Sequence, residues 1–293
     1  MIDVGWPAER LSGNISTLYR ALPLRERPDA AAADGFAHIE TWWPFAPDET
    51  PSSGDVERFG LAVERAGVQV ASLGFSSGSR ADGERGLPAL FCGRDRLGRH
   101  APIALDLAER VGCSLLNLLY GRRDPRVELA EQRNQADDAV AFVAEKAAER
   151  GMRVMVEPLS RSDGPGYLVS SVSEAIAVCA SVEARCGVPI GICFDVFQLY
   201  PQEADLAVSA ARALPWIRHV QLADWPGRRP PGTGEIDIPA VLAALGTGGY
   251  RGLVGLEYIP EAPDPSDPAA AAADRGHMNG TRRRDDERTP GDG

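Results

Sequence analysis

Short apolar runs alternate with longer amphipathic stretches along most of the chain. Such a run is typical of a buried strand, and apolar residues at helical spacing are typical of a helix packed on a sheet. The runs predict strands at 11–19, 36–43, 68–74, 114–120, 152–157, 190–195, 217–222 and 252–258. The stretches between them predict helices at 25–34, 54–66, 97–111, 127–150, 172–185, 203–214 and 238–245.

This alternation predicts an α/β fold, and strands at this spacing favour a single (β/α)8 TIM barrel over residues 1–262. A doubly wound open sheet is the alternative, which is less favoured because no glycine-rich turn follows the first strand. The polar segment at 76–96 is long for a loop, so we expect it to be functional. Residues 263–293 contain few bulky apolar side chains, so we expect a disordered tail.

Composition narrows the class of protein without naming it. The chain has 293 residues, 44% hydrophobic and 25% charged, which is ordinary for a globular protein. Its net charge of −11 argues against a general nucleic-acid binder, and no apolar run is long enough for a membrane span. The five cysteines form no C-x-x-C pair, which, with no targeting signal in the sequence, predicts a cytoplasmic protein with reduced thiols.

Four of the predicted strands carry an oxygen-bearing side chain at or near the C-terminal end. These residues are Glu157, Asp195, Gln221 and Glu257. The residue before each of them is apolar, so alternation along the strand would turn the four polar side chains the same way. Because catalytic groups of TIM barrels come from these strand ends, we expect the four to meet at the barrel mouth.

Converging carboxylates repel one another unless a cation neutralises them. A hard divalent ion, Mg²⁺ or Mn²⁺, prefers oxygen donors, so Glu157, Asp195, Gln221 and Glu257 are predicted metal ligands. The structural alternative is that such strand-end carboxylates cap nearby helices or pair with arginines.

In its motifs the chain resembles the hydroxypyruvate isomerase family within the xylose-isomerase-like barrels, over residues 14–260. The motifs that carry the resemblance are GFAHIETWWPF at 35–45, GERG at 83–86, NLLYG at 117–121, VEPL at 156–159, FDVF at 194–197, HVQLA at 219–223, PGTGEID at 231–237 and LEY at 256–258. The resemblance implies a metal on the same four residues, with Glu157 and Glu257 as the proton-transfer groups. It implies an isomerase that converts hydroxypyruvate to tartronate semialdehyde through a metal-stabilised enediolate.

The carboxylate of such a substrate needs a cation. Arg228, seven residues after Gln221, is the first candidate and Arg85 in the 76–96 loop the second. His38 and Glu40 on the second predicted strand are further pocket candidates, and a satisfied polar pair is the other interpretation for them.

Two positions depart from the family pattern. Gln198 stands where relatives usually have a histidine, and it keeps a hydrogen bond but cannot change charge near neutral pH. Ile259 stands where relatives often have a basic residue. Both changes bear on which substrate the site accepts.

Three other functions stay open: a ketose 3-epimerase, a 2-oxo-tetronate isomerase, and a non-catalytic barrel that binds sugar acids. The epimerase is less favoured because epimerases of the superfamily tend to have histidine at the position of Gln221. A zinc endonuclease of this fold would need several histidines, and the chain has four. The expected partner is therefore a small keto acid or sugar, with no nucleic acid and no membrane, and a homo-oligomer is compatible with the sequence.

Overall fold

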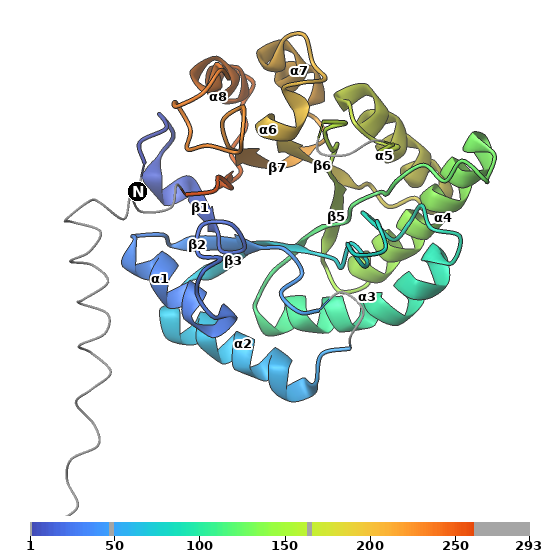
Figure 1. The fold of residues 1–293 in the computed structure, drawn as a ribbon, viewed down its shortest axis with the longest axis horizontal. Coiled ribbons are helices and arrows are strands. Elements are labelled where there is room, and N and C mark those ends of the chain that lie inside the picture. The colour runs from blue at the N-terminus through green and yellow to red at the C-terminus, as the bar shows by residue number, and fades with distance from the viewer. Residues whose placement is uncertain (1, 47–49, 163–165, 261–293) are drawn as a thin grey trace, which may run out of the picture. The chain divides into compact units, whose positions relative to one another are not determined.

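Eight parallel strands close into a barrel with helices around it (Figure 1). The computed structural model describes residues 2–46, 50–162 and 166–260. The strands are β1 (Leu11–Asn14), β2 (His38–Thr41), β3 (Gln69–Gly74), β4 (Leu115–Asn117), β5 (Arg153–Val156), β6 (Gly191–Asp195), β7 (Ile217–Leu222) and β8 (Val254–Leu256). Each strand pairs with the next, and β1 pairs with β8, so the predicted (β/α)8 TIM barrel is confirmed.

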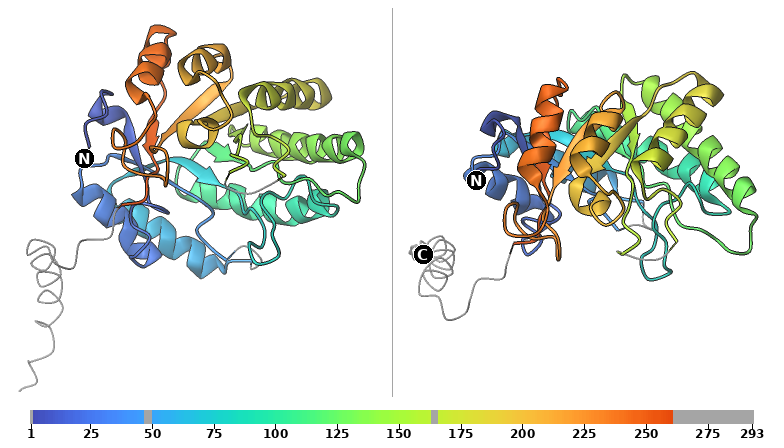
Figure 2. Two further views of the ribbon diagram at one scale, coloured as in Figure 1. Left: turned by 45° about the horizontal axis from the view of Figure 1, so that its top comes forward. Right: turned by 90° about the horizontal axis from the view of Figure 1, so that it is seen from above.

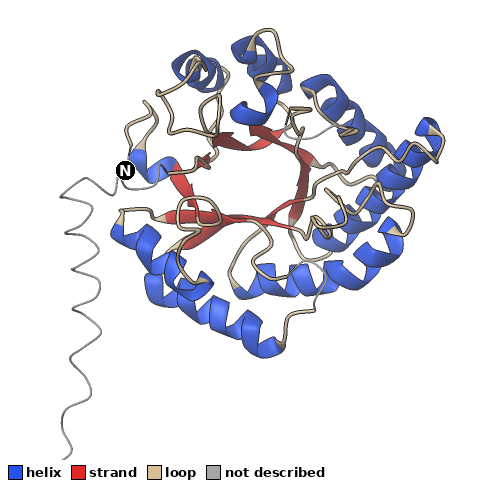
Figure 3. Cartoon of the chain, in the orientation of Figure 1, coloured by secondary structure: helices blue, strands red, loops and turns tan. Residues whose placement is uncertain are grey.

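The helices form an outer ring around the strands, as the colouring by secondary structure shows (Figure 3). Two further views show the same arrangement from other directions (Figure 2). The α-helices are α1 (Arg27–Ala33), α2 (Ser53–Ala66), α3 (Gly93–Arg110), α4 (Leu129–Ala148), α5 (Val172–Cys186), α6 (Val196–Leu199), α7 (Leu206–Ala213) and α8 (Ile238–Thr247). Two short 3₁₀ helices, η1 (Ala8–Arg10) and η2 (Leu24–Glu26), complete the described set.

Local signals explain where several of these elements begin and end. Ser52 and Asp55 form a capping box at the start of α2, and the Ser171 side chain accepts from the Glu174 N–H at the start of α5. Gly67 and Gly187 end the same two helices in the left-handed conformation, which glycine adopts without a steric penalty.

One predicted boundary was wrong and one helix was not predicted, each for an identifiable reason. The first strand stops at Asn14 and not at residue 19, because the N–H groups of Thr17 and Leu18 donate to the Asn14 carbonyl and turn the chain. The short helix α6 was not predicted, and Asp195 caps its start. The predicted tail at 263–293 and the domain boundary at 262 lie outside the described residues.

The outer face of the strands forms the contact with the helices. Val156, Phe194, Val220 and Leu256 are each 0% exposed, as the predicted strand phase requires. That phase directs the residue that follows each of them toward the barrel interior and mouth, whether it is still in the strand or directly after its end. No helix in the described part of the chain is long and apolar enough to cross a membrane.

Candidate active site

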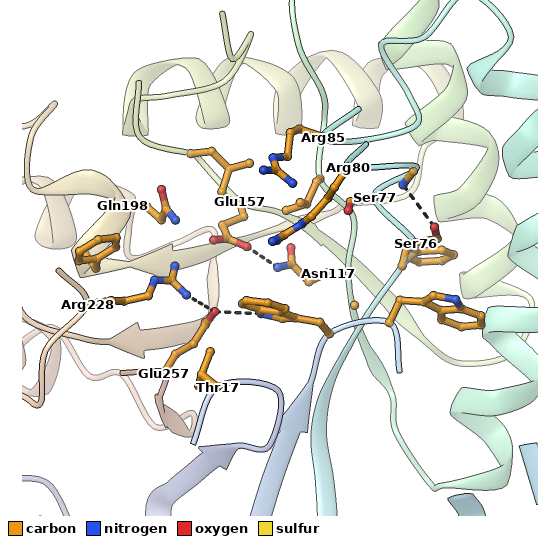
Figure 4. Close-up of a pocket in the computed structure, with 18 of the residues that line it drawn as sticks. Thr17, Ser76, Ser77, Arg80, Arg85, Asn117, Glu157, Gln198, Arg228 and Glu257 are labelled. Carbon is orange, nitrogen blue, oxygen red and sulfur yellow. Dashed lines mark hydrogen bonds and ion pairs between the residues drawn. The ribbon is translucent and has the colours of Figure 1, made fainter. Parts of the chain in front are cut away.

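Three buried carboxylates lie at the C-terminal ends of β5, β6 and β8. Glu157 follows β5, Asp195 ends β6 and Glu257 follows β8, and they are 7%, 1% and 2% exposed. Glu157 and Glu257 point into the same pocket (Figure 4). The structure therefore brings three of the four predicted metal ligands to the mouth of the barrel.

Arg228 pairs with two of these carboxylates. Its Nη1 lies 2.6 Å from Glu257 Oε1 and its Nη2 lies 3.1 Å from Asp195 Oδ2. The guanidinium carbon is 5.0 Å from the ring centroid of Phe197, and Trp42 Nε1 donates to the same Glu257 oxygen at 2.9 Å. The predicted substrate-binding arginine thus reaches the site, where it acts as a counter-ion.

Asp195 both caps a helix and pairs with an arginine, the two roles that the structural alternative gave to strand-end carboxylates. Its Oδ1 caps α6 by accepting from the backbone N–H groups of Phe197 at 2.9 Å and Gln198 at 3.4 Å. Its Oδ2 forms the ion pair with Arg228. Glu157, in contrast, accepts a neutral hydrogen bond from Asn117 Nδ2 at 2.6 Å.

Burial and the charges of neighbouring carboxylates raise the pKa of all three carboxyl groups. Burial is the largest cause in each case. It raises the pKa of Asp195 to about 6 and that of Glu257 to about 7, even though Arg228 opposes the shift. The pKa of Glu157 lies well above its ordinary value because of burial and the neighbouring charges of Glu257 and Asp195. One arginine leaves the cluster short of positive charge.

The donor set of this cluster fits a hard divalent cation. Glu257 Oε2 and Asn117 Oδ1 are buried and have no hydrogen-bond partner within the described residues. As the side chains lie, however, no group of three or more His, Cys, Asp or Glu in residues 2–46, 50–162 and 166–260 has the arrangement of a metal site. Glu157, Asp195 and Glu257 are the residues that would hold a metal, and that role stays a prediction.

Gln221, the fourth predicted ligand, belongs to a different group of side chains deeper in the barrel. Its Nε2 donates to Glu40 Oε1 at 2.8 Å, and its Oε1 accepts from Cys193 Sγ at 3.0 Å. Glu40 also pairs with His219, and both side chains are 1% exposed. Asn14 Nδ2 and Ser12 Oγ complete the shell around Glu40 at 3.0 and 3.3 Å. We call these residues, Ser12, Asn14, Glu40, His219 and Gln221, the interior network.

The structure does not bring Glu40 or His38 to the pocket surface. Glu40 lies in the interior network, where it pairs with His219 and not with His38, so the alternative of a satisfied pair formed by Glu40 and His38 is not met either. His38 Nδ1 is buried and has no hydrogen-bond partner among the described residues. His38 stands at the N-terminal end of β2, away from the barrel mouth. Neither is among the described residues that line the pocket.

The pocket above the carboxylates has a volume of about 680 Å³. Aromatic side chains form much of its wall, including Trp42, Trp43, Phe75 and Phe197. Arg85 and Gln198 line it as predicted, and the Arg85 Nη1 atom is buried without a hydrogen-bond partner among the described residues. Gln198 Oε1 accepts from the Ser160 N–H at 2.7 Å, so this side chain is fixed to the β5 loop.

Sequence analysis missed three residues that shape this site. Asn117 donates a hydrogen bond to Glu157, and Trp42 donates one to Glu257. His100 supports the pocket wall, because its Nε2 accepts from the Ser76 N–H at 3.0 Å and its ring lies 4.5 Å from that of Trp43. Burial lowers the pKa of His100 to about 4, with Arg96 adding to the effect. For Asn117 a signal was available, since it is a polar residue at the end of an apolar strand.

Comparison with protein families agrees with this geometry. Residues 28–279 match the model of the xylose isomerase-like TIM barrel family. The chain belongs to the xylose isomerase-like TIM barrel family. It is 36% identical over 259 residues to a putative hydroxypyruvate isomerase of Streptomyces coelicolor, covering 88% of this chain and 93% of that protein.

Two further proteins are similar to this xylose isomerase-like barrel, one in sequence and one in structure. A 2-oxo-tetronate isomerase of Cupriavidus necator is 31% identical over 256 residues, covering 86% of this chain and 93% of its own. The crystal structure of an AP endonuclease, family 2, from Brucella melitensis superposes with a TM-score of 0.78 at 26% identity, covering 87% of this chain and 94% of that one. The family and its named relatives identify the chain as an isomerase.

Proposed function

We propose that this barrel is a metal-dependent sugar-acid isomerase, with hydroxypyruvate and tartronate semialdehyde as the leading substrate pair. The observation that carries the proposal is the cluster of Glu157, Asp195 and Glu257 under the pocket, which Arg228 only partly neutralises. The 36% identity to a protein named putative hydroxypyruvate isomerase supports the substrate.

The reaction moves one proton and one carbonyl between adjacent carbons. Mg²⁺ or Mn²⁺, held by Glu157, Asp195 and Glu257, would supply Lewis-acid polarisation of the substrate carbonyl. One of the two glutamates removes the proton from the hydroxymethyl carbon, and the other returns a proton to the neighbouring carbon. Both glutamates line the pocket, as proton transfer to substrate requires.

Arg228 is our candidate for binding the substrate carboxylate. It lines the pocket, and its guanidinium offers a planar pair of donors that matches a carboxylate. Since it already pairs with Asp195 and Glu257, this assignment requires the guanidinium to turn from these oxygens toward the substrate. Arg85, which also lines the pocket, is the second candidate.

The 2-oxo-tetronate isomerase is the second candidate, because the Cupriavidus necator relative of that name is 31% identical and the pocket of about 680 Å³ accommodates a substrate longer than three carbons. A zinc nuclease is disfavoured by the histidines of the described chain. His38 is at the far end of β2, His100 lies in the aromatic wall, and His219 is bound to Glu40.

Proton NMR in D₂O with hydroxypyruvate tests the proposal. We expect tartronate semialdehyde to appear, or deuterium to enter the hydroxymethyl carbon, with Mg²⁺ or Mn²⁺ and not after chelation. Deuterium entry without product would transfer the assignment to a longer keto acid. Folded protein that exchanges no proton with either metal would contradict hydroxypyruvate as substrate, and 2-oxo-tetronates and ketoses would be tested next.

A further inference from the structure

The loop between β7 and α8 is built around a buried carboxylate that the proposed chemistry does not use. Asp224 is 0% exposed, and each of its oxygens accepts from two backbone N–H groups. Oδ1 accepts from Trp225 at 2.9 Å and Ile236 at 3.0 Å. Oδ2 accepts from Gly232 and Gly234, each at 2.9 Å. We call this arrangement the Asp224 clamp.

Further backbone contacts close the loop at both ends. Asp224 and Arg229 exchange N–H to carbonyl bonds of 2.8 and 3.0 Å, and the Glu235 N–H donates to the Trp225 carbonyl at 2.8 Å. Gly234 allows the two sides of the loop to approach each other closely, because a Cβ there would lie 2.2 Å from the Trp225 carbonyl oxygen. The clamp therefore fixes the path of residues 224–236 from the inside.

Arg228 sits at the tip of this clamped loop in a conformation that arginine seldom adopts. Its φ is 59°, in the left-handed region, and Gly227 before it has φ of 86°. The Ile259 N–H donates to the Arg228 carbonyl at 2.7 Å, which ties the tip to the end of β8 next to Glu257. A strained backbone of this kind persists only where the surrounding contacts impose it.

Asp224 itself is not placed to touch a substrate. Its two oxygens each carry two hydrogen bonds, so their lone pairs are fully used. Asp224 is also not among the described residues that line the pocket, whereas Gly227 and Arg228 are. Any effect of Asp224 on the reaction must then pass through the loop and reach the site at Arg228.

We propose that Asp224 is a positioning residue: its four backbone hydrogen bonds hold the loop in the strained path that keeps the Arg228 guanidinium beside Glu257 and Asp195, from where it can turn to the substrate carboxylate. The inference rests on the proposed function for the role of Arg228 in substrate binding. The clamp itself stands on contacts that do not depend on that function.

A double-mutant cycle tests the proposal. Asp224→Asn keeps the shape of the side chain and replaces one accepting oxygen with a donor that faces two N–H groups. We expect Asp224→Asn to lower kcat/KM about 100-fold, mainly through KM, because small misplacements of a binding group have effects of this size. In the Arg228→Gln background the same change should alter kcat/KM by less than about twofold, since the group that it positions is already gone.

Equal losses in both backgrounds would overturn the proposal, because they would mean that Asp224 supports the fold and not Arg228. Asp237→Asn is the matched control: Asp237 caps α8 from an exposed position just beyond the loop, so its replacement should leave KM unchanged. If Asp224→Asn does not fold, Gly234→Ala disturbs the clamp without changing Asp224 and should give the same pattern in the cycle.

Hydrogen exchange measured by mass spectrometry gives a readout that needs no substrate. Peptides that cover residues 224–236 should exchange faster in Asp224→Asn than in the wild type, while the α3 and α4 peptides stay unchanged. If this loop exchanges at the same rate in Asp224→Asn as in the wild type, the clamp is refuted. If the wild type turns over no keto acid and the loop still loosens, the proposed function fails and the clamp stands.

Discussion

The barrel contains two groups of buried polar side chains, one around the single carboxylate of Glu40 and one with three carboxylates, that are built in opposite ways. In the interior network, the two oxygens of Glu40 accept from Asn14, Gln221 and Ser12 and pair with His219. At the mouth, Arg228 pairs with two of the three carboxylates, Asp195 and Glu257, and Glu257 Oε2 has no partner among the described residues. The interior network comes from β1, β2 and β7, the mouth carboxylates come from the ends of β5, β6 and β8, and the two groups differ in how completely they are satisfied.

That difference separates a structural role from a chemical one. Burial alone would raise the pKa of Glu40, but the charge of His219 and the surrounding hydrogen bonds hold it below the ordinary value. At the mouth, burial raises the pKa of Glu157 and Glu257, and the charges of neighbouring carboxylates raise it further. A buried charge that its own fold leaves unsatisfied is available to a ligand, and one that is fully satisfied is not.

The largest effect should come from Glu257→Gln. The amide Oε1 can still accept from Trp42 and Arg228, so the fold should persist, while the group can no longer accept a proton. We expect kcat to fall about 10³-fold, equivalent to about 4 kcal/mol of barrier. Steady-state kinetics with calorimetric ligand binding would check this.

The exposed Glu235→Gln is the control and should behave as wild type. Turnover by Glu257→Gln close to that of the wild type would remove Glu257 from the chemistry. Loss of ligand binding together with turnover would favour a barrel that only binds sugar acids.

Glu40→Ala should do the reverse, lowering stability more than turnover. The change leaves His219, Gln221 and Asn14 buried without their acceptor, and breaking a buried pair in this way costs about 3 kcal/mol. Urea unfolding would measure the loss, and activity per folded molecule should fall less than about tenfold. Glu40→Gln should cost less because its amide oxygen still accepts. A loss of turnover as large as that of Glu257→Gln, at wild-type stability, would contradict a structural role.

The smallest effect is a dependence of stability on pH in chelator-treated protein. Burial raises the pKa of Glu257 from its ordinary value of 4.5 to about 7 and the pKa of Asp195 from 3.8 to about 6. Groups with raised pKa bind protons more tightly when folded, so the stability that they contribute is fully present below the ordinary values and is lost as pH rises through 6 and 7. We expect the free energy of unfolding to decline across this window.

Urea unfolding at several pH values would measure that decline, and Glu257→Gln should flatten it. The contribution of Glu40 has the opposite sign, because its pKa is lowered: it is present above 4.5 and is lost below. A stability that rises between pH 5 and pH 7 in the chelated protein, a range set by these pKa values, would contradict the picture of an under-neutralised mouth.

The sequence was enough to predict the barrel and the polar strand ends, because alternation along a strand is a local property. Val156 and Phe194 are 0% exposed as that alternation required, and the next residues, Glu157 and Asp195, lie at the mouth. Boundaries failed where a single side chain or turn decided them, as at Asn14 and at the α6 cap on Asp195.

The partners of the polar side chains could not be predicted from the sequence. Glu40 meets His219 across 179 positions and Gln221 across 181, and no local pattern encodes such a meeting. Arg228 was a reasonable candidate for a carboxylate partner, but a left-handed backbone at a non-glycine residue gives no sign in the sequence. The roles of Glu157, Glu257 and the metal remain predictions for the experiments above.

The interior network also has a consequence for how the chain is made. It joins β1 and β2 to β7 across Gly255 of β8, where a Cβ would lie 2.2 Å from Glu40 Oε2. A nascent chain that has left the ribosome only as far as β6 therefore holds Glu40 without His219 or Gln221. We expect its first half to stay incompletely folded until synthesis is nearly finished, so that chaperones can engage it for most of that time.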